Sequence, residues 1–238
     1  MSRPQRRKIF LALLLALTLF VFGAASASAA IITIDLDTEF SGADEPEGPT
    51  PWLTATFDDE VVGGGTVRLT MSASGLVEQE FVDDWLFNLD PSLDPTLLSF
   101  SVVGTPGSTP NSISTGVNAF MADGDGNFDI EFDFPPPPGS FAALFTTGEA
   151  VVYDITYGGV GFNANSFNTG SFPGGGNGTF DSAAHVQSID SPAGENAGSG
   201  WIGGDAPGEV PEPASLVICS LLFSFGAVGL RYRRSHAA

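Results

Sequence analysis

Cysteine is almost absent from this chain of 238 residues, and the only one, Cys219, lies in an apolar run near the C-terminal end. The residues before that run therefore form no internal disulfide and supply no thiolate ligand for zinc. A fold without such covalent or metal links depends on its hydrophobic core. The 20 phenylalanine residues of the chain provide large apolar side chains for that core.

Basic side chains are equally scarce between the two ends of the chain. All 28 acidic residues but only one Lys or Arg residue, Arg68, lie between Asp35 and Glu212, so this region has a formal net charge of −27. A surface of this sign repels the phosphates of nucleic acid, which argues against a nucleic-acid partner, and it attracts divalent cations. Mutual repulsion also keeps such a body soluble, which is the alternative reason for the acidic excess.

Side chains for nucleophilic catalysis are few in the same region. It has one histidine, His185, and no lysine or cysteine. A Ser-His-Asp triad can use only this histidine, and no segment resembles the strand-to-helix turn that carries the nucleophile of many hydrolases. We interpret His185 as a structural residue and expect a protein that is not an enzyme. A glycan hydrolase with two carboxylates remains an alternative, because acidic residues are abundant.

Helical periodicity is also absent, since no stretch of residues 30–199 keeps an apolar stripe at a spacing of 3.6 residues. Short runs alternate instead between apolar and polar residues, separated by Gly, Pro, Asn and Asp. In residues 128–134 three Phe and one Ile alternate with three acidic residues. Such alternation predicts half-buried antiparallel strands. We predict an all-β fold, an antiparallel β-sandwich of jelly-roll type over residues 30–190, with a β-barrel as the alternative.

The N-terminal segment, residues 1–29, has the order of a secretory signal peptide. Four basic residues come first, an apolar stretch follows at residues 9–22, and small residues end at Ala29. This order predicts export across the inner membrane and cleavage near Ala29. The structural alternative is an uncleaved membrane anchor or a buried helix.

The C-terminal part begins with residues 191–209, which are rich in Gly, Pro and acid and are predicted to be a linker, with Trp201 and Ile202 docked on the body. Residues 214–230 carry no charge, which predicts a single transmembrane helix. The positive-inside rule places the basic cluster that follows in the cytoplasm. This cluster is Arg231, Arg233 and Arg234.

The motif Pro211-Glu212-Pro213, the apolar run and the basic cluster together resemble the PEP-CTERM sorting signal of Gram-negative bacteria that make extracellular polysaccharide. The resemblance covers residues 210–234. It implies recognition of the Pro-Glu-Pro motif by exosortase, a membrane protease-transpeptidase, with the three arginines as the retention signal. It also implies a transient membrane anchor, followed by release to the cell surface or the exopolysaccharide matrix.

Residues 123–129, with the sequence DGDGNFD, place oxygen ligands at alternate positions, namely Asp123, Asp125, Asn127 and Asp129. A loop of this kind can surround Ca²⁺, which takes six to eight oxygen ligands. The twelfth position is Phe134, where an EF-hand has a bidentate Glu, so we expect a calcium site in a β-rich loop. An Asp/Gly turn without calcium is the structural alternative.

These features together predict an exported acidic protein of the cell surface or exopolysaccharide matrix with a structural or adhesive role. The functional alternative is a calcium-dependent carbohydrate-binding module. It is suggested by the acidic loop and by tryptophans expected at the surface, namely Trp52, Trp85 and Trp201. Extracellular polysaccharide is the ligand expected in either case.

Overall fold

The computed structural model describes residues 30–207, except residues 124, 136–143, 175–178 and 191–197. The predicted signal peptide and the predicted sorting segment at residues 210–234 lie outside this part of the chain. A search of the described residues finds no helix with the length and apolar character needed to cross a bilayer. The transmembrane prediction for residues 214–230 therefore stays a prediction.

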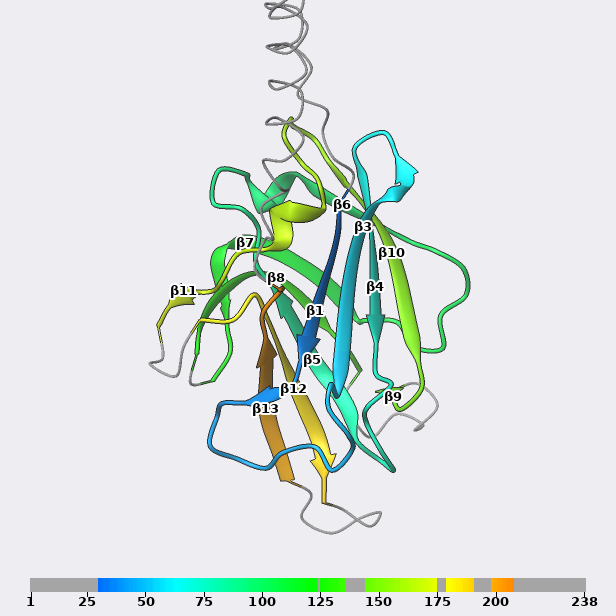
Figure 1. The fold of residues 1–238 in the computed structure, drawn as a ribbon, viewed down its shortest axis with the longest axis vertical. Coiled ribbons are helices and arrows are strands. Elements are labelled where there is room, and N and C mark those ends of the chain that lie inside the picture. Colours follow the sequence, from blue (N-terminus) through cyan, green and yellow to red (C-terminus); the bar gives the residue numbers. More distant parts are fainter. Residues whose placement is uncertain (1–29, 124, 136–143, 175–178, 191–197, 208–238) are drawn as a thin grey trace, which may run out of the picture. The chain divides into compact units, whose positions relative to one another are not determined.

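The described residues form an all-β fold with antiparallel strand pairing, as the alternating pattern predicted (Figure 1). Two short 3₁₀ helices, η1 (Pro95–Leu97) and η3 (Ala164–Phe167), lie in the connections. The strands are β1 (Ile31–Leu36), β2 (Thr38–Glu39), β3 (Leu53–Gly63), β4 (Thr66–Ser72), β5 (Phe81–Phe87), β6 (Leu98–Val102), β7 (Ser112–Met121), β8 (Gly126–Asp133), β9 (Phe145–Thr146), β10 (Ala150–Tyr157), β11 (Phe172–Pro173), β12 (Ser182–Ile189) and β13 (Gly198–Gly204).

The strands belong to two sheets. The first has the order β1-β3-β4-β10-β6, and the second has the order β11-β8-β5-β12-β13-β2, with β7 paired to β8 and β9 paired to β5. Neighbours in sequence form the hairpins β3–β4, β7–β8 and β12–β13. The pair β5–β12, by contrast, joins segments about 100 residues apart, so the centre of the second sheet depends on long-range pairing.

The main hydrophobic core contains residues of both sheets. Phe57 of β3 and Trp85 of β5 are both fully buried in it, and the ring of Phe57 stacks on Phe167 with ring centroids 3.9 Å apart. Phe132, from the segment with the clearest alternation, is also fully buried there. Because one core takes side chains from both sheets, the sheets pack against each other in a sandwich-like arrangement.

A second, smaller cluster lies on the opposite face of the second sheet. Leu86 of β5 belongs to it, whereas the flanking Trp85 and Phe87 belong to the main core, as strand alternation requires. The sheet is therefore apolar at some positions on both faces. The buried members of this cluster are Phe40, Leu86, Ala122, Phe128 and Ala183.

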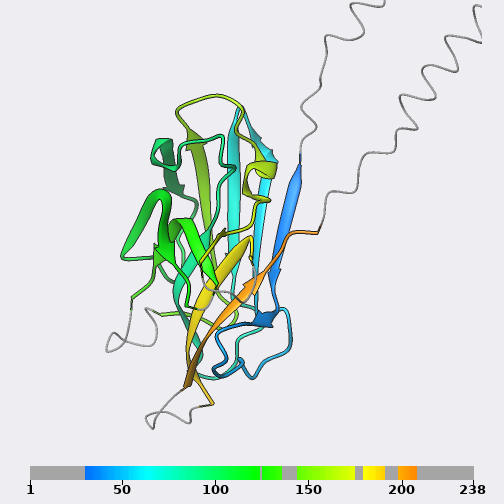
Figure 2. The same cartoon turned by 90° about the vertical axis from the view of Figure 1, so that its left-hand side faces the viewer.

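The predicted boundary of the body at residue 190 is wrong, because part of the predicted linker forms β13. This strand pairs with β12, with Ser182 opposite Gly204, and Ile202 is fully buried, so docking of that residue is confirmed. Figure 2 shows β13 approaching β1. A Cβ atom at Gly204 would overlap the carbonyl oxygen of Asp35, so the glycines that suggested a linker allow close packing here.

Candidate functional site

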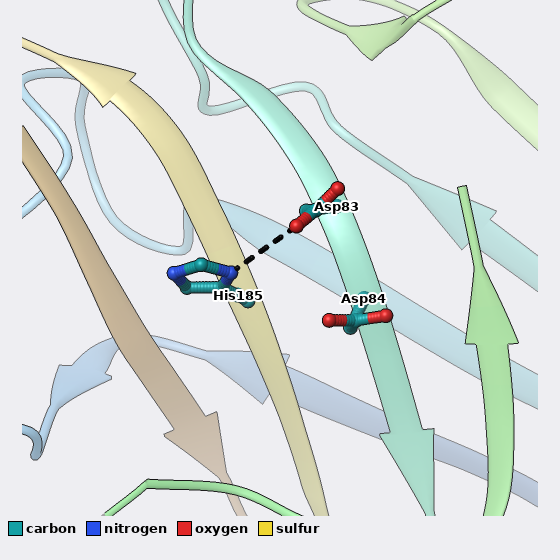
Figure 3. A group of neighbouring side chains, drawn as sticks. All are labelled: Asp83, Asp84 and His185. Carbon is teal, nitrogen blue, oxygen red and sulfur yellow. Dashed lines mark ion pairs between the residues drawn. The ribbon is translucent and has the colours of Figure 1, made fainter. Parts of the chain in front are cut away.

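Two adjacent acidic residues of β5, Asp83 and Asp84, lie where the register with β12 changes. Val82 pairs with Val186, and Asp84 pairs with His185, the residue just before Val186. Two residues of β5 therefore lie opposite one residue of β12, which is the definition of a β-bulge. The bulge places both carboxylates near the imidazole of His185 (Figure 3).

The packing of β5 requires this extra residue. Val82 and Trp85 are three positions apart, yet both are fully buried in the main core. A regular strand places residues three apart on opposite faces. Both side chains can point into the same core only if the strand contains one extra residue between them, as a β-bulge does. The bulge keeps both apolar side chains in the core and leaves the two acidic side chains outside it.

The ligand atoms of Asp83, Asp84 and His185 all lie within 4.8 Å of one another. Nδ1 of His185 is 3.5 Å from Oδ2 of Asp83, and the two side chains are 21% and 18% exposed. The amide Nε2 of Gln187 donates to the same Asp83 oxygen. The ring of Trp201, on the neighbouring β13, stacks on the imidazole with ring centroids 5.1 Å apart and planes inclined by 19°.

Asp84 lies in an environment that disfavours a charged carboxylate. Burial, followed by the charges of Asp83 and Glu131, raises the pKa of Asp84 to about 6, while His185 acts in the opposite direction. Burial, with Asp133 as a second cause, also raises the pKa of Glu131. This face of the second sheet therefore gathers negative charge around a single imidazole.

Positive side chains of the described body do not offset this charge. Arg68 is the only Lys or Arg residue between residues 30 and 207. It lies on β4 in the first sheet, where its Nε and Nη2 donate to the two carboxylate oxygens of Asp154 at 2.8 and 3.1 Å. The arrangement at His185 can therefore attract a cation, and it is the one group of three or more His, Cys, Asp or Glu side chains with this proximity in the described part of the chain.

The predicted calcium ligands do not converge in this way. Asp129 uses both carboxylate oxygens as acceptors, from the backbone amides of Leu89 at 3.1 Å and Asn118 at 2.7 Å. Within the described residues the carboxylates of Asp123, Asp125 and Asp129 form no metal-binding group. Part of the reason is that Asn127 and Asp129 lie on β8, where extended residues two apart are separated by about 7 Å along the strand.

Asp125 differs from the other three predicted ligands. Its side chain is fully buried, and its Oδ2 accepts a hydrogen bond from Oγ of Ser171 at 2.9 Å. Its Oδ1 has no hydrogen-bond partner. Burial raises the pKa of Asp125, against the effects of hydrogen bonds from Ser171 and from the backbone of Phe180. Asp123 is exposed and Asn127 is partly buried.

Two of the three tryptophans expected at the surface are buried. Trp52 is 4% exposed and Trp85 is fully buried, so neither offers a ring face to a ligand. Trp201 is partly exposed, and it is the ring beside His185. The expectation of exposed aromatic residues is thus wrong for Trp52 and Trp85.

Sequence reasoning noted His185 but missed its two acidic neighbours. The segment FVDDWLF carried a usable signal, because two acidic residues between Val82 and Trp85 interrupt the alternation. Such an interruption within an apolar strand is typical of a bulge. The pairing of β5 with β12 brings the two acidic residues to the histidine. No local sequence pattern predicts this pairing.

Comparisons with known proteins add no family to this description. The chain matched no model of a protein family, no curated protein and no solved structure. The residues predicted as the sorting signal lie outside the described part of the chain.

Proposed function

We propose that this protein is an exported acidic protein of the cell surface or exopolysaccharide matrix, with a structural or adhesive role and no catalytic activity. The observation that carries the proposal is the order of segments along the chain. A segment with the residue order of an export signal, residues 1–29, precedes the body, and a Pro-Glu-Pro motif, an uncharged run of 17 residues at 214–230 and three arginines follow it. Two predictions also form part of this proposal. They are the jelly-roll connectivity of the strands in the body and the transmembrane helix at residues 214–230.

The partners in this proposal follow from the same segments. Exosortase recognises the motif Pro211, Glu212 and Pro213. The two prolines keep the backbone of this motif extended, so that a protease can bind it as a strand. The apolar run holds the chain in the inner membrane until it is processed. Arg231, Arg233 and Arg234 retain the end of the chain in the cytoplasm. Extracellular polysaccharide is the partner at the destination.

Removal of residues 210–238 is expected to abolish surface or matrix localisation in a host that has exosortase. Without the tail, the body crosses the inner membrane but is not retained there for processing, so it accumulates in the periplasm or the medium. Cell fractionation with an antibody to the body measures the distribution. Alanine at Pro211 and Pro213 should reproduce the defect, whereas Pro207→Ala, outside the motif, should leave localisation unchanged. The same distribution for the full and shortened chains contradicts the proposal.

A calcium-dependent carbohydrate-binding module is the second candidate function. The observation that favours it is the buried Oδ1 of Asp125, which has no hydrogen-bond partner. A buried carboxylate oxygen without a donor is costly, and a bound cation relieves that cost. Trp201 is the partly exposed aromatic ring that this candidate uses to contact a sugar.

Addition of calcium is expected to raise the melting temperature of the purified full chain if this second candidate is correct. Calcium at about 100 times its dissociation constant stabilises the folded state by about 2.7 kcal/mol. Thermal melting by circular dichroism, with calcium or with a chelator, measures the shift. Asp125→Asn should remove the shift, and Asp44→Asn, an exposed acid elsewhere, should keep it. Identical melting curves in both buffers rule out the calcium-dependent function.

A further inference from the structure

Asp83, Asp84 and His185 bring two carboxylates and one imidazole nitrogen together on two adjacent, paired strands. We propose that these three side chains form a binding site for a divalent transition-metal ion, for which Zn²⁺ is the probe. The site is separate from the predicted calcium ligands at residues 123–129, and it goes beyond the proposed surface role because it assigns a chemical capacity to the body itself.

The donor set decides which class of metal fits. Zn²⁺ binds imidazole nitrogen and carboxylate oxygen, with bonds of about 2.0 to 2.2 Å. Ca²⁺ and Mg²⁺ take oxygen ligands, so a set that depends on His185 discriminates against them. Three protein ligands leave a coordination position for water or an external group. The partial exposure of Asp83 and His185 gives solvent access to that position.

Neighbouring side chains hold two of the three ligands in place. Gln187 donates through its Nε2 to Oδ2 of Asp83, which restricts the rotation of that carboxylate. Trp201 stacks on the ring of His185 and fixes its plane. Side chains that orient metal ligands in this way typically change metal affinity by about 10- to 100-fold. Gln187 and Trp201 are therefore positioning residues of the site.

The charge balance is a separate observation that calls for a cation. No donor among the described residues forms a hydrogen bond to the carboxylate of Asp84, although that side chain is partly buried. Asp83, Glu131 and Asp133 add negative charge around it. Arg68, the only Lys or Arg residue between residues 30 and 207, is bonded to Asp154 in the other sheet. A divalent cation bound by Asp84 and its neighbours compensates charges that the chain leaves unpaired.

Titration of the purified full chain with zinc chloride in a calorimeter tests the site directly. We expect one high-affinity Zn²⁺ per chain and a loss of affinity of more than about 10-fold for Asp83→Asn, Asp84→Asn and His185→Gln. Two controls are matched in kind. Glu60→Gln removes the same charge from an exposed position of β3, and His236→Gln removes the other histidine of the chain.

Both controls should bind zinc within about twofold of the parent chain, and millimolar calcium should not displace the ion. Unchanged zinc affinity of His185→Gln overturns the proposal. So does displacement of zinc by calcium, since it indicates attraction by the acidic surface alone. Neither result bears on localisation, so the proposed surface role is tested independently.

A measurement on the unaltered chain avoids any effect of substitutions on folding. Diethyl pyrocarbonate modifies accessible imidazoles, and peptide mass spectrometry separates the products at His185 and His236. Zinc should protect His185 and leave the labelling of His236 unchanged relative to metal-free buffer. Equal labelling of His185 with and without saturating zinc overturns the proposal.

Discussion

Replacement of Trp85 by alanine is expected to lower the free energy of unfolding by about 3 to 5 kcal/mol, the usual cost of removing a large aromatic side chain from a core. The indole is fully buried and stacks on Phe87 and Phe145, with ring centroids 5.8 and 6.0 Å away. Its Nε1 donates to Oγ of Ser182 at 2.9 Å, which ties β5 to β12. Alanine leaves a cavity and removes this hydrogen bond.

Urea unfolding followed by circular dichroism measures the effect without relying on tryptophan fluorescence. Phe172→Ala is the matched control, because that ring is 58% exposed, and its effect should stay within about 0.5 kcal/mol. Trp85→Phe keeps part of the packing and should fall between the two. Equal stability of Trp85→Ala and Phe172→Ala is the result that contradicts the described core.

Replacement of Asp129 by alanine is expected to cost about 2 to 4 kcal/mol, and to do so equally with calcium or with a chelator. The carboxylate accepts hydrogen bonds from the amides of Leu89 and Asn118, at 3.1 and 2.7 Å. Alanine leaves the buried amide of Leu89 without its acceptor, at about 1 to 3 kcal/mol, and it also removes the part-buried hydrogen bond from the amide of Asn118. Asn118 also has a φ of 49°, a conformation that this hydrogen bond helps to hold.

Thermal melting of Asp129→Ala and of Asp123→Ala in both buffers separates a structural role from a role as a metal ligand. The exposed Asp123 should be replaceable with little change in stability. A destabilisation of Asp129→Ala that appears only when calcium is present refutes the structural role. It also restores Asp129 as a calcium ligand.

The class of fold was predictable because it depends on local patterns. Alternation at Ile130 and Phe132 identified a strand whose apolar side chains are indeed buried in the main core, whereas Phe128, which the same pattern put on that face, is buried in the second cluster. β13 was missed for the opposite reason. Its glycines lower the local preference for a strand, yet pairing with β12 and close approach to Asp35 require residues without a side chain. Whether a segment forms a strand depends on the strands that pack beside it, and the local sequence pattern does not show these neighbours.

The candidate site was largely hidden from sequence reasoning for a related physical reason. Asp83 and His185 are about 100 residues apart, and they meet because the core selects a particular register between β5 and β12. The oxygen ligands around Asp125, in contrast, were adjacent in sequence and easily noticed. Residues that are close in sequence along an extended strand do not bring their side chains together. The motif at residues 123–129 therefore predicted a group of ligands less well than its sequence suggested.

The pairing of Arg68 also bears on how the body withstands proteases. Trypsin cuts after Lys or Arg, and the segment from residue 30 to 207 offers it that single position. The peptide bond after Arg68 lies inside β4, between β3 and β10, with the guanidinium held by Asp154. Proteases act preferentially on exposed loop tips. The folded body therefore has no accessible cleavage site for trypsin-like enzymes between residues 30 and 207. It also has no lysine side chain there for amine-reactive crosslinkers.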